Sequence, residues 1–167
     1  NAKTNETSFW RCFQTGLVLN GLIGIVGGLA LGLGWGLLQG EKYAQFSSII
    51  QLMFGLAAVQ MIVDSIGSTF THPFYAKEEF AQLAISGSIV PSIALVFNFG
   101  LVLITRSPVA MLAAGVFESL LTLIITLFLF RKRFGVEHMK PGFDLSVAKE
   151  ILSVGIRSYP GNISGRI

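Results

Sequence analysis

Residues 12–40 read CFQTGLVLNGLIGIVGGLALGLGWGLLQG, and none of these 29 residues is charged. An α-helix rises about 1.5 Å per residue, so about 20 apolar residues are enough to cross a hydrocarbon core of about 30 Å. The run therefore predicts a transmembrane helix with residues to spare, which would tilt or project from the bilayer.

The rest of the chain repeats this pattern three times. Residues 43–63 and 80–105 carry no charge, and residues 107–130 carry only Glu118. Of the 167 residues, 52% are hydrophobic and 13% are charged, whereas soluble domains carry about 25% charged residues. The runs lack the strict alternation of membrane β-strands; LTLIITLFLF, for example, is continuously apolar. We predict an all-α polytopic membrane protein with transmembrane helices at about 12–40, 44–66, 80–105 and 108–130.

Lysine and arginine residues are distributed unequally between the two sides of these helices. Eight fall on one side and two on the other: Lys3, Arg11, Lys77, Arg131, Lys132, Arg133, Lys140 and Lys149 against Lys42 and Arg106. Because an excess of basic residues marks cytoplasmic loops, we predict that the N-terminal segment and residues 131–148 are cytoplasmic. Nucleic-acid binding would require a basic surface on a folded domain, and the sequence predicts no such domain.

Glycine recurs along the first helix at intervals of four residues. Gly16, Gly24, Gly28, Gly32, Gly36 and Gly40 are separated by multiples of four, with Asn20 in the one gap. This spacing places them on one face of a helix, where small residues let two backbones approach closely in lipid. The stripe predicts a packing groove, which belongs either to a static interface or to a helix that slides or bends in a transporter.

Polar residues within the predicted spans are candidates for function, because such residues are rare in membranes. Glu118 falls near the middle of the fourth span, so we expect it to couple transport to protons or to pair with a group on another helix. Asp64 is expected near the cytoplasmic end of the second span, as an interfacial carboxylate or a second coupling residue. Asn98 is expected to bond between helices or to line a polar cavity.

Pro91 and two arginines are further unusual residues. Proline lacks a backbone N–H and bends a helix, so Pro91 marks a hinge or a simple packing kink in the third span. If a fifth segment enters the bilayer near Ile151, Arg157 lies about 9 Å deep and Arg166 about 22 Å deep. A deep arginine needs an anion, either a carboxylate such as Glu118 or a substrate phosphate.

The sequence contains no pattern typical of a catalytic site. His72 and His138 are far apart, Cys12 has no histidine partner, and the loops carry no paired-aspartate signature. We predict a protein that is not an enzyme and that holds no metal or cofactor.

Several segments together resemble one transporter family. A glycine-rich helix is followed by a helix leading into YAKEEFAQLAISGSI, by the tight turn TRSP, and by a helix ending in LFLFRKRFG. Residues 148–167, AKEILSVGIRSYPGNISGRI, carry Gly155 and Pro160 where that family has a glycine and a proline at the start of its second lobe. The chain resembles the polysaccharide flippase branch of the multidrug/oligosaccharidyl-lipid/polysaccharide exporter (MOP) superfamily, whose relatives include Wzx-type O-antigen flippases, MATE exporters and the lipid II flippase MurJ.

The resemblance implies a two-lobe transporter of 12–14 helices in the bacterial cytoplasmic (inner) membrane. It would flip a lipid-linked oligosaccharide with an undecaprenyl diphosphate headgroup, by alternating access, for surface polysaccharides such as lipopolysaccharide. Residues 1–130 would be the later part of the N-terminal lobe, residues 131–148 the interlobe loop, and residues 149–167 the start of the C-terminal lobe. We therefore interpret the chain as a piece of a longer protein.

Roles for single residues follow from this resemblance. Arg157, Arg166 and Asn98 would contact the substrate, Glu118 and Asp64 would couple ions, and Gly24, Gly28, Gly32, Gly36 and Pro91 would let the lobe pack and bend. Its partners would be the lipid-linked oligosaccharide, membrane lipids, a polysaccharide polymerase and chain-length proteins.

Other functions stay open at this point. A MATE-like cation or drug antiporter would have an acidic cavity where the flippase has a cationic one. A membrane-bound glycosyl or lipid transferase would carry carboxylate pairs in its loops, and KEE at residues 77–79 is a weak match. Glu118 argues against a scaffold without transport activity, which has little use for a carboxylate in mid-membrane.

Overall fold

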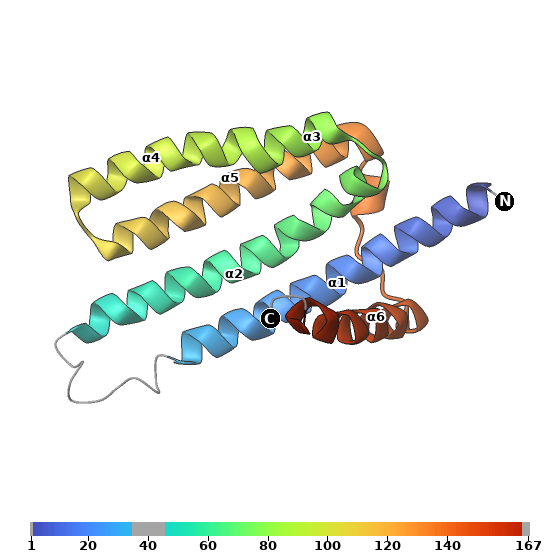
Figure 1. The fold of residues 1–167 in the computed structure, drawn as a ribbon, viewed down its shortest axis with the longest axis horizontal. Helices are drawn as coiled ribbons and strands as arrows, with labels where there is room; N and C mark the ends of the chain where they lie inside the picture. Colours follow the sequence, from blue (N-terminus) through green and yellow to red (C-terminus); the bar gives the residue numbers. More distant parts are fainter. Residues whose placement is uncertain (1, 35–45, 165–167) are drawn as a thin grey trace.

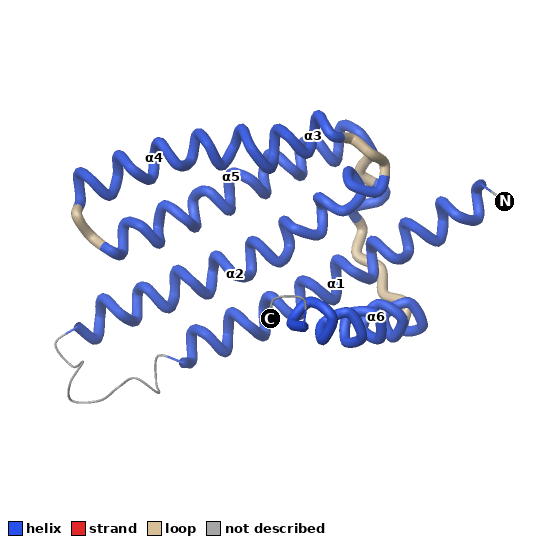
Figure 2. The backbone as a smooth tube through the Cα atoms, viewed as in Figure 1, coloured by secondary structure: helices blue, strands red, loops and turns tan. Residues whose placement is uncertain are grey.

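The computed structural model describes residues 2–34 and 46–164. All regular secondary structure in these residues is helical (Figure 2). In chain order the elements are α1 (Ala2–Gly34), α2 (Ser47–Ala76), α3 (Phe80–Ala84), the π-helix η3 (Ile85–Ile89), α4 (Val90–Thr105), α5 (Pro108–Phe134), the 3₁₀-helix η4 (Glu137–Met139) and α6 (Leu145–Ser164). Four segments are long and apolar enough to cross a membrane: Glu6–Gly34, Ser47–Ala76, Phe80–Thr105 and Pro108–Phe134. The prediction of an all-α chain with four candidate spans is confirmed.

The candidate spans form a row in which α1 and α2 are antiparallel, α2 and α5 are parallel, and α5 and α4 are antiparallel (Figure 1). α1 packs against α2, α2 against α5, and α5 against α4, while α6 lies beside α1. The hydrogen bond from the backbone N–H of Asp144 to Oγ1 of Thr15, 3.2 Å long, ties the start of α6 to α1.

Basic residues gather at one end of this row. Arg11 lies in the first turns of α1, Lys77 follows α2, and residues 131–133 end α5, so all of them lie where α1 begins and α5 ends (Figure 1). Arg106 lies at the opposite end, in the turn between α4 and α5. We call the first of these the basic end.

A cluster of aromatic side chains fills the space between α1, α2 and α5 at the basic end. Its buried members are Trp10, Phe13, Phe70, Phe74 and Phe130. Phe130 is completely buried and meets Phe70 edge to face, with ring centroids 5.2 Å apart. Each such aromatic pair stabilises packing by about 0.5–1.5 kcal/mol beyond the area it buries.

The first helix begins at Ala2 rather than at residue 12. The prediction began the helix after the last charge, Arg11, but Trp10 is buried in the aromatic cluster and holds the preceding turns in the helix. The predicted end, residue 40, lies outside the described residues.

The second helix ends at Ala76 rather than at residue 66. Its polar segment is anchored by Phe70 and Phe74, which are buried in the aromatic cluster. Hydroxyl side chains in this segment satisfy their donors on carbonyls of their own helix: Ser65 on Met61 at 2.8 Å, and Thr69 on Ser65 at 3.2 Å. Asp64 therefore lies inside α2, about 18 Å from its end, and not at the cytoplasmic end where it was expected.

The third span covers residues 80–105, as predicted, but its hydrogen-bond pattern changes before Pro91. The N–H of Val90 bonds the carbonyl of Ile85, five residues earlier, instead of a partner four residues earlier. Pro91 has no N–H, so Gly87 lacks its α-helical donor. Such π-helical turns inside α-helices occur frequently at functional sites.

The segment between α5 and α6 is shorter than the predicted loop at 131–148. α5 continues to Phe134 and stops at Gly135, whose φ of +89° is a conformation that favours glycine. α6 already begins at Leu145, because the Asp144 carboxylate accepts hydrogen bonds from the N–H groups of Ser146 and Val147 and caps the helix.

Candidate functional site

Part of the glycine stripe is the contact surface between α1 and α2. Gly24 and Gly28 are buried. A Cβ atom on Gly24 would lie 2.6 Å from Cβ of Ser65, and one on Gly28 would lie 3.0 Å from the carbonyl oxygen of Ala58. At Gly32 the nearest atom would be 3.9 Å away, which is ordinary contact. The two buried glycines therefore let the backbones of α1 and α2 approach more closely than any larger residue would allow. The bending expected at the glycine stripe stays a prediction.

Glu118 and Asn98 meet between α4 and α5. Nδ2 of Asn98 donates to Oε2 of Glu118 at 3.2 Å, and both side chains are half-buried. Glu118 lies about 15 Å along α5 from Pro108, deep in a candidate span. Glu118 was expected either to couple transport to protons or to pair with a group on another helix. The structure contains such a pair, with the side-chain amide of Asn98 on α4.

A cavity of about 320 Å³, lined by both polar and apolar residues, opens between α2, η3 and α5. Five of its lining residues carry a carboxylate or an aliphatic hydroxyl: Asp64, Ser68, Thr71, Ser119 and Thr122. We call this cavity the hydroxyl groove and these five residues its polar wall. Val63, Gly67, Tyr75, Leu83, Gly87 and Leu123 complete the lining.

Helix periodicity brings the polar wall together. Asp64, Ser68 and Thr71 stand at positions i, i+4 and i+7 of α2, on one face of the helix. Ser119 and Thr122 stand at i and i+3 of α5, and α5 packs against α2. The two carboxylates expected to couple ions are thus on different surfaces, since Glu118 bonds to α4 while Asp64 lines the groove.

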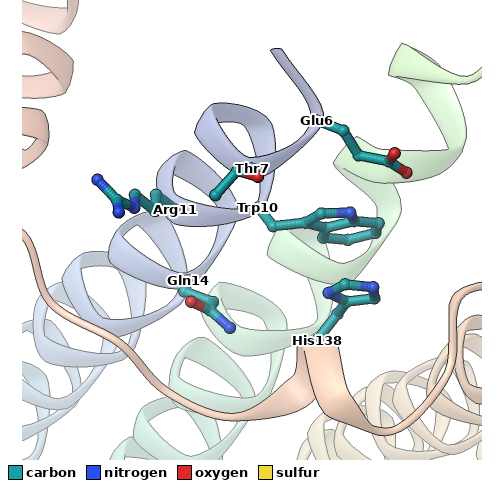
Figure 3. A pocket seen from close by; sticks show the side chains of 6 residues that line it. All are labelled: Glu6, Thr7, Trp10, Arg11, Gln14 and His138. Carbon is teal, nitrogen blue, oxygen red and sulfur yellow. The ribbon is translucent and has the colours of Figure 1, made fainter. Parts of the chain in front are cut away.

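A second cavity, of about 520 Å³, lies at the basic end (Figure 3). Glu6, Thr7, Trp10, Arg11 and Gln14 of α1 line it together with His138 of η4. The ring of His138 stacks on Trp10 with centroids 3.9 Å apart, so it covers one face of the indole. This contact fixes the connection between α5 and α6 against α1.

Several predicted site residues cannot be placed in either cavity. The backbone of Arg157 belongs to α6, but its side chain lies outside the described part of the molecule. Arg166 and Gly36 lie outside the described residues altogether. Within the described residues, the structure brings only Asn98 and Glu118 together among the expected site residues.

Sequence reasoning missed four members of the polar wall. Ser68, Thr71, Ser119 and Thr122 are uncharged and common in helices, so none attracts notice alone. One pattern in the sequence could have found two of them: Ser68 and Thr71 follow Asp64 by four and seven residues, which places all three on one face of a helix. The matching hydroxyls of α5 become evident only once α2 and α5 are known to pack together.

Comparison with known proteins found no matching family, no matching curated protein and no matching solved structure.

Proposed function

We propose that this chain is part of a membrane transporter that flips a lipid-linked oligosaccharide across the bacterial cytoplasmic membrane by alternating access. The observation that best supports transport is the hydroxyl groove, a cavity between three candidate spans with five polar side chains, including the Asp64 carboxylate, in its wall. Polar groups inside a membrane are costly and usually serve a substrate or ion pathway, so a scaffold has little reason to contain this cavity.

The proposed substrate class rests on the resemblance of residues 148–167 to the start of the second lobe of polysaccharide flippases. The charge distribution agrees with an anionic substrate that arrives from the cytoplasm. The basic end carries Arg11, Lys77 and residues 131–133, and such clusters attract phosphate-bearing lipids at the inner leaflet. A diphosphate headgroup would therefore concentrate at the end where the transport cycle begins.

The packing of the helices is suited to a transporter that changes shape. Gly24 and Gly28 let α1 approach Ser65 and Ile62 of α2 closely, and the π-helical turn before Pro91 interrupts the third span. Interruptions of this kind are common where transporter helices bend around a binding site.

A cation antiporter is the second candidate, and one observation favours it. In the interiors of the described candidate spans the charged side chains are Asp64 and Glu118, and both are acidic. An acidic cavity attracts cationic substrates, whereas a flippase needs cations for its diphosphate.

Deletion of the gene in its own host separates these functions. For a flippase we expect surface polysaccharide to fall at least tenfold while its lipid-linked precursor accumulates in the inner leaflet, measured by glycan staining and lipid extraction. A plasmid copy should restore both measurements. Unchanged surface glycan with increased accumulation of cationic dyes would replace the flippase by the antiporter, and no change in either would contradict a transport role in these two pathways.

A further inference from the structure

We propose that a narrow apolar groove between α1, α2 and α6 holds one acyl chain of an anionic phospholipid, from the membrane leaflet at the basic end. The groove encloses about 300 Å³. Seven residues of α1 between Phe9 and Ile23 line it, together with three of α2 and with Ile151 and Leu152 of α6. We call it the lipid groove. This binding does not rest on the proposed transport function.

The lipid groove has the dimensions of a single acyl chain. Its α1 wall runs from Phe9 at the basic end to Ile23, about 21 Å along the helix. Half of a bilayer, headgroup region included, is about 20–22 Å thick. A helix about 10 Å across would fill about 1,600 Å³ over this length, several times the volume of the groove. A hydrocarbon chain therefore fits where another helix does not.

The lining of the lipid groove suits a hydrocarbon chain. Most of it is apolar, and the Ile23 and Leu152 side chains are 54% and 46% exposed. Two of the polar lining residues already bond to each other, since Nδ2 of Asn20 donates to Oγ1 of Thr69 at 2.9 Å. This hydrogen bond lowers the cost of placing hydrocarbon against them.

A lysine stands beside the lipid groove at the basic end. Nζ of Lys77 lies 5.5 Å from the centroid of the Phe9 ring, which lines the groove. Lys77 forms no ion pair with another described residue, so its ammonium group is available to a lipid phosphate. Basic segments beside a membrane attract anionic lipids.

The headgroup preference follows from the charge of the lining. None of the described lining residues of the groove is acidic. The ammonium group of a zwitterionic lipid such as phosphatidylethanolamine therefore finds no carboxylate there. An anionic lipid such as phosphatidylglycerol needs none, and its phosphate gains the attraction of Lys77.

The bound chain would extend the packing of α6 on α1. The two helices meet at the start of α6, where Ala148 is 3% exposed and the N–H of Asp144 bonds Thr15 (Figure 1). Further along, Ile151 and Leu152 line the groove and are exposed. An acyl chain would supply the apolar contact that α1 does not, and so hold α6 in place.

Lipid retention by the purified full-length protein tests the proposal. The protein is equilibrated in mild detergent with equal amounts of phosphatidylglycerol and phosphatidylethanolamine, and native mass spectrometry counts and identifies the retained lipids. Gly16 lines the groove, and a Cβ atom on it would meet nothing within 4 Å, so Gly16→Leu fills the groove without a clash. We expect this variant to retain one phosphatidylglycerol fewer per chain than the parent.

Two matched variants serve as controls. Gly21 is also in α1 and also has open space at its Cβ, but it does not line the groove; Gly21→Leu should retain as much lipid as the parent. Lys77→Gln should reduce the preference for phosphatidylglycerol several-fold. Lys132→Gln removes another exposed lysine of the basic end and should leave that preference unchanged.

Cys12 provides a second measurement, which needs no substitution in the groove. Its thiol is exposed and lines the groove. Added phosphatidylglycerol should slow its alkylation by N-ethylmaleimide several-fold, followed on the Cys12 peptide by mass spectrometry. Phosphatidylethanolamine should slow it less. This measurement provides the test if Gly16→Leu does not fold.

The proposal is overturned if Gly16→Leu and Gly21→Leu retain equal amounts of lipid, if the two headgroups protect Cys12 equally, or if the retained lipid is polyprenyl-linked. A Cys12 that resists alkylation with and without added lipid would also overturn it, because another part of the protein would then cover the groove. Retained phosphatidylglycerol with unchanged surface glycan after gene deletion would keep the lipid groove and reject the flippase.

Discussion

The hydrogen bond from Asn98 to Glu118 joins α4 to α5 deep in two candidate spans. Hydrogen bonds between membrane helices contribute about 0.6 kcal/mol on average and up to about 1.7 kcal/mol. We expect a coupling energy in this range from a double-mutant cycle of Asn98→Leu and Glu118→Leu, measured by reversible unfolding in mixed micelles. Glu118→Gln should retain most of the stability, because its amide oxygen still accepts from Asn98. Strictly additive single effects would argue that the pair contributes nothing.

Asp144 is a second residue whose chemistry can be tested alone. The Ser146 hydroxyl and the backbone N–H groups of Val147 and Ser146 hold the pKa of Asp144 below its usual value. The cap is therefore complete above the pKa of the unfolded chain, about 3.9, and is lost as the pH falls through the lower pKa of the folded state.

We expect Asp144→Ala to accelerate hydrogen exchange of the first-turn amides of α6 at pH 6 and to remove their dependence on acid. Asp144→Asn, which retains an oxygen acceptor, should show a smaller acceleration. Equal protection in Asp144→Ala and the parent would show that the cap does not hold this turn.

Single residues also show what sequence reasoning can find in a membrane chain. A carboxylate in a long apolar run is conspicuous, so hydropathy alone is enough to select Asp64 and Glu118. Hydropathy does not select Ser119, because a hydroxyl group lowers the hydropathy of a helix only slightly. Ser119 becomes a candidate only because it lines the groove together with residues of the neighbouring α2. The partner of Glu118 depends on the packing of α4 against α5. Asn98 was expected either to bond between helices or to line a polar cavity that contacts the substrate, and its partner was not known.

At the scale of elements, the α1–α2 interface depends on the two buried glycines. Gly24→Ala would place a methyl group 2.6 Å from Cβ of Ser65, and overpacking of this kind costs about 1–3 kcal/mol. We expect this variant to lower the unfolding midpoint in detergent. Gly21→Ala is the matched control, since its Cβ would meet nothing within 4 Å and alanine favours helix. A stabilised Gly24→Ala would contradict the close contact.

Helix boundaries show where local pattern and tertiary packing diverge. The hydropathy of residues 80–105 predicted the third span to the residue, because apolar length alone determines it. The true start of α1 depends on Trp10 entering an aromatic cluster built from three helices, and the true end of α2 depends on Phe70 and Phe74 entering the same cluster. Neither cause is visible in a hydropathy profile.

At the scale of the whole molecule, the distribution of basic residues agrees with the path of the chain through the row of helices. Four spans that alternate in direction along the chain bring Arg11, Lys77 and residues 131–133 to one end and Arg106 to the other (Figure 1). This asymmetry followed from counting lysines and arginines between apolar runs, so the alternation of the helices was predictable. The order of neighbours in the row was not, because apolar faces in lipid carry little information about which helix lies beside which.

The distribution of bulk along this row has a mechanical consequence. Large buried rings, with Phe130 at their centre, fill the basic end, whereas Ala114, about 24 Å further along α5, is among the buried residues toward the other end. Interlocked rings resist sliding, and small side chains tolerate it. We therefore expect any rocking of α4 and α5 against α1 and α2 to be smallest beside Phe130 and largest at the turn that carries Arg106.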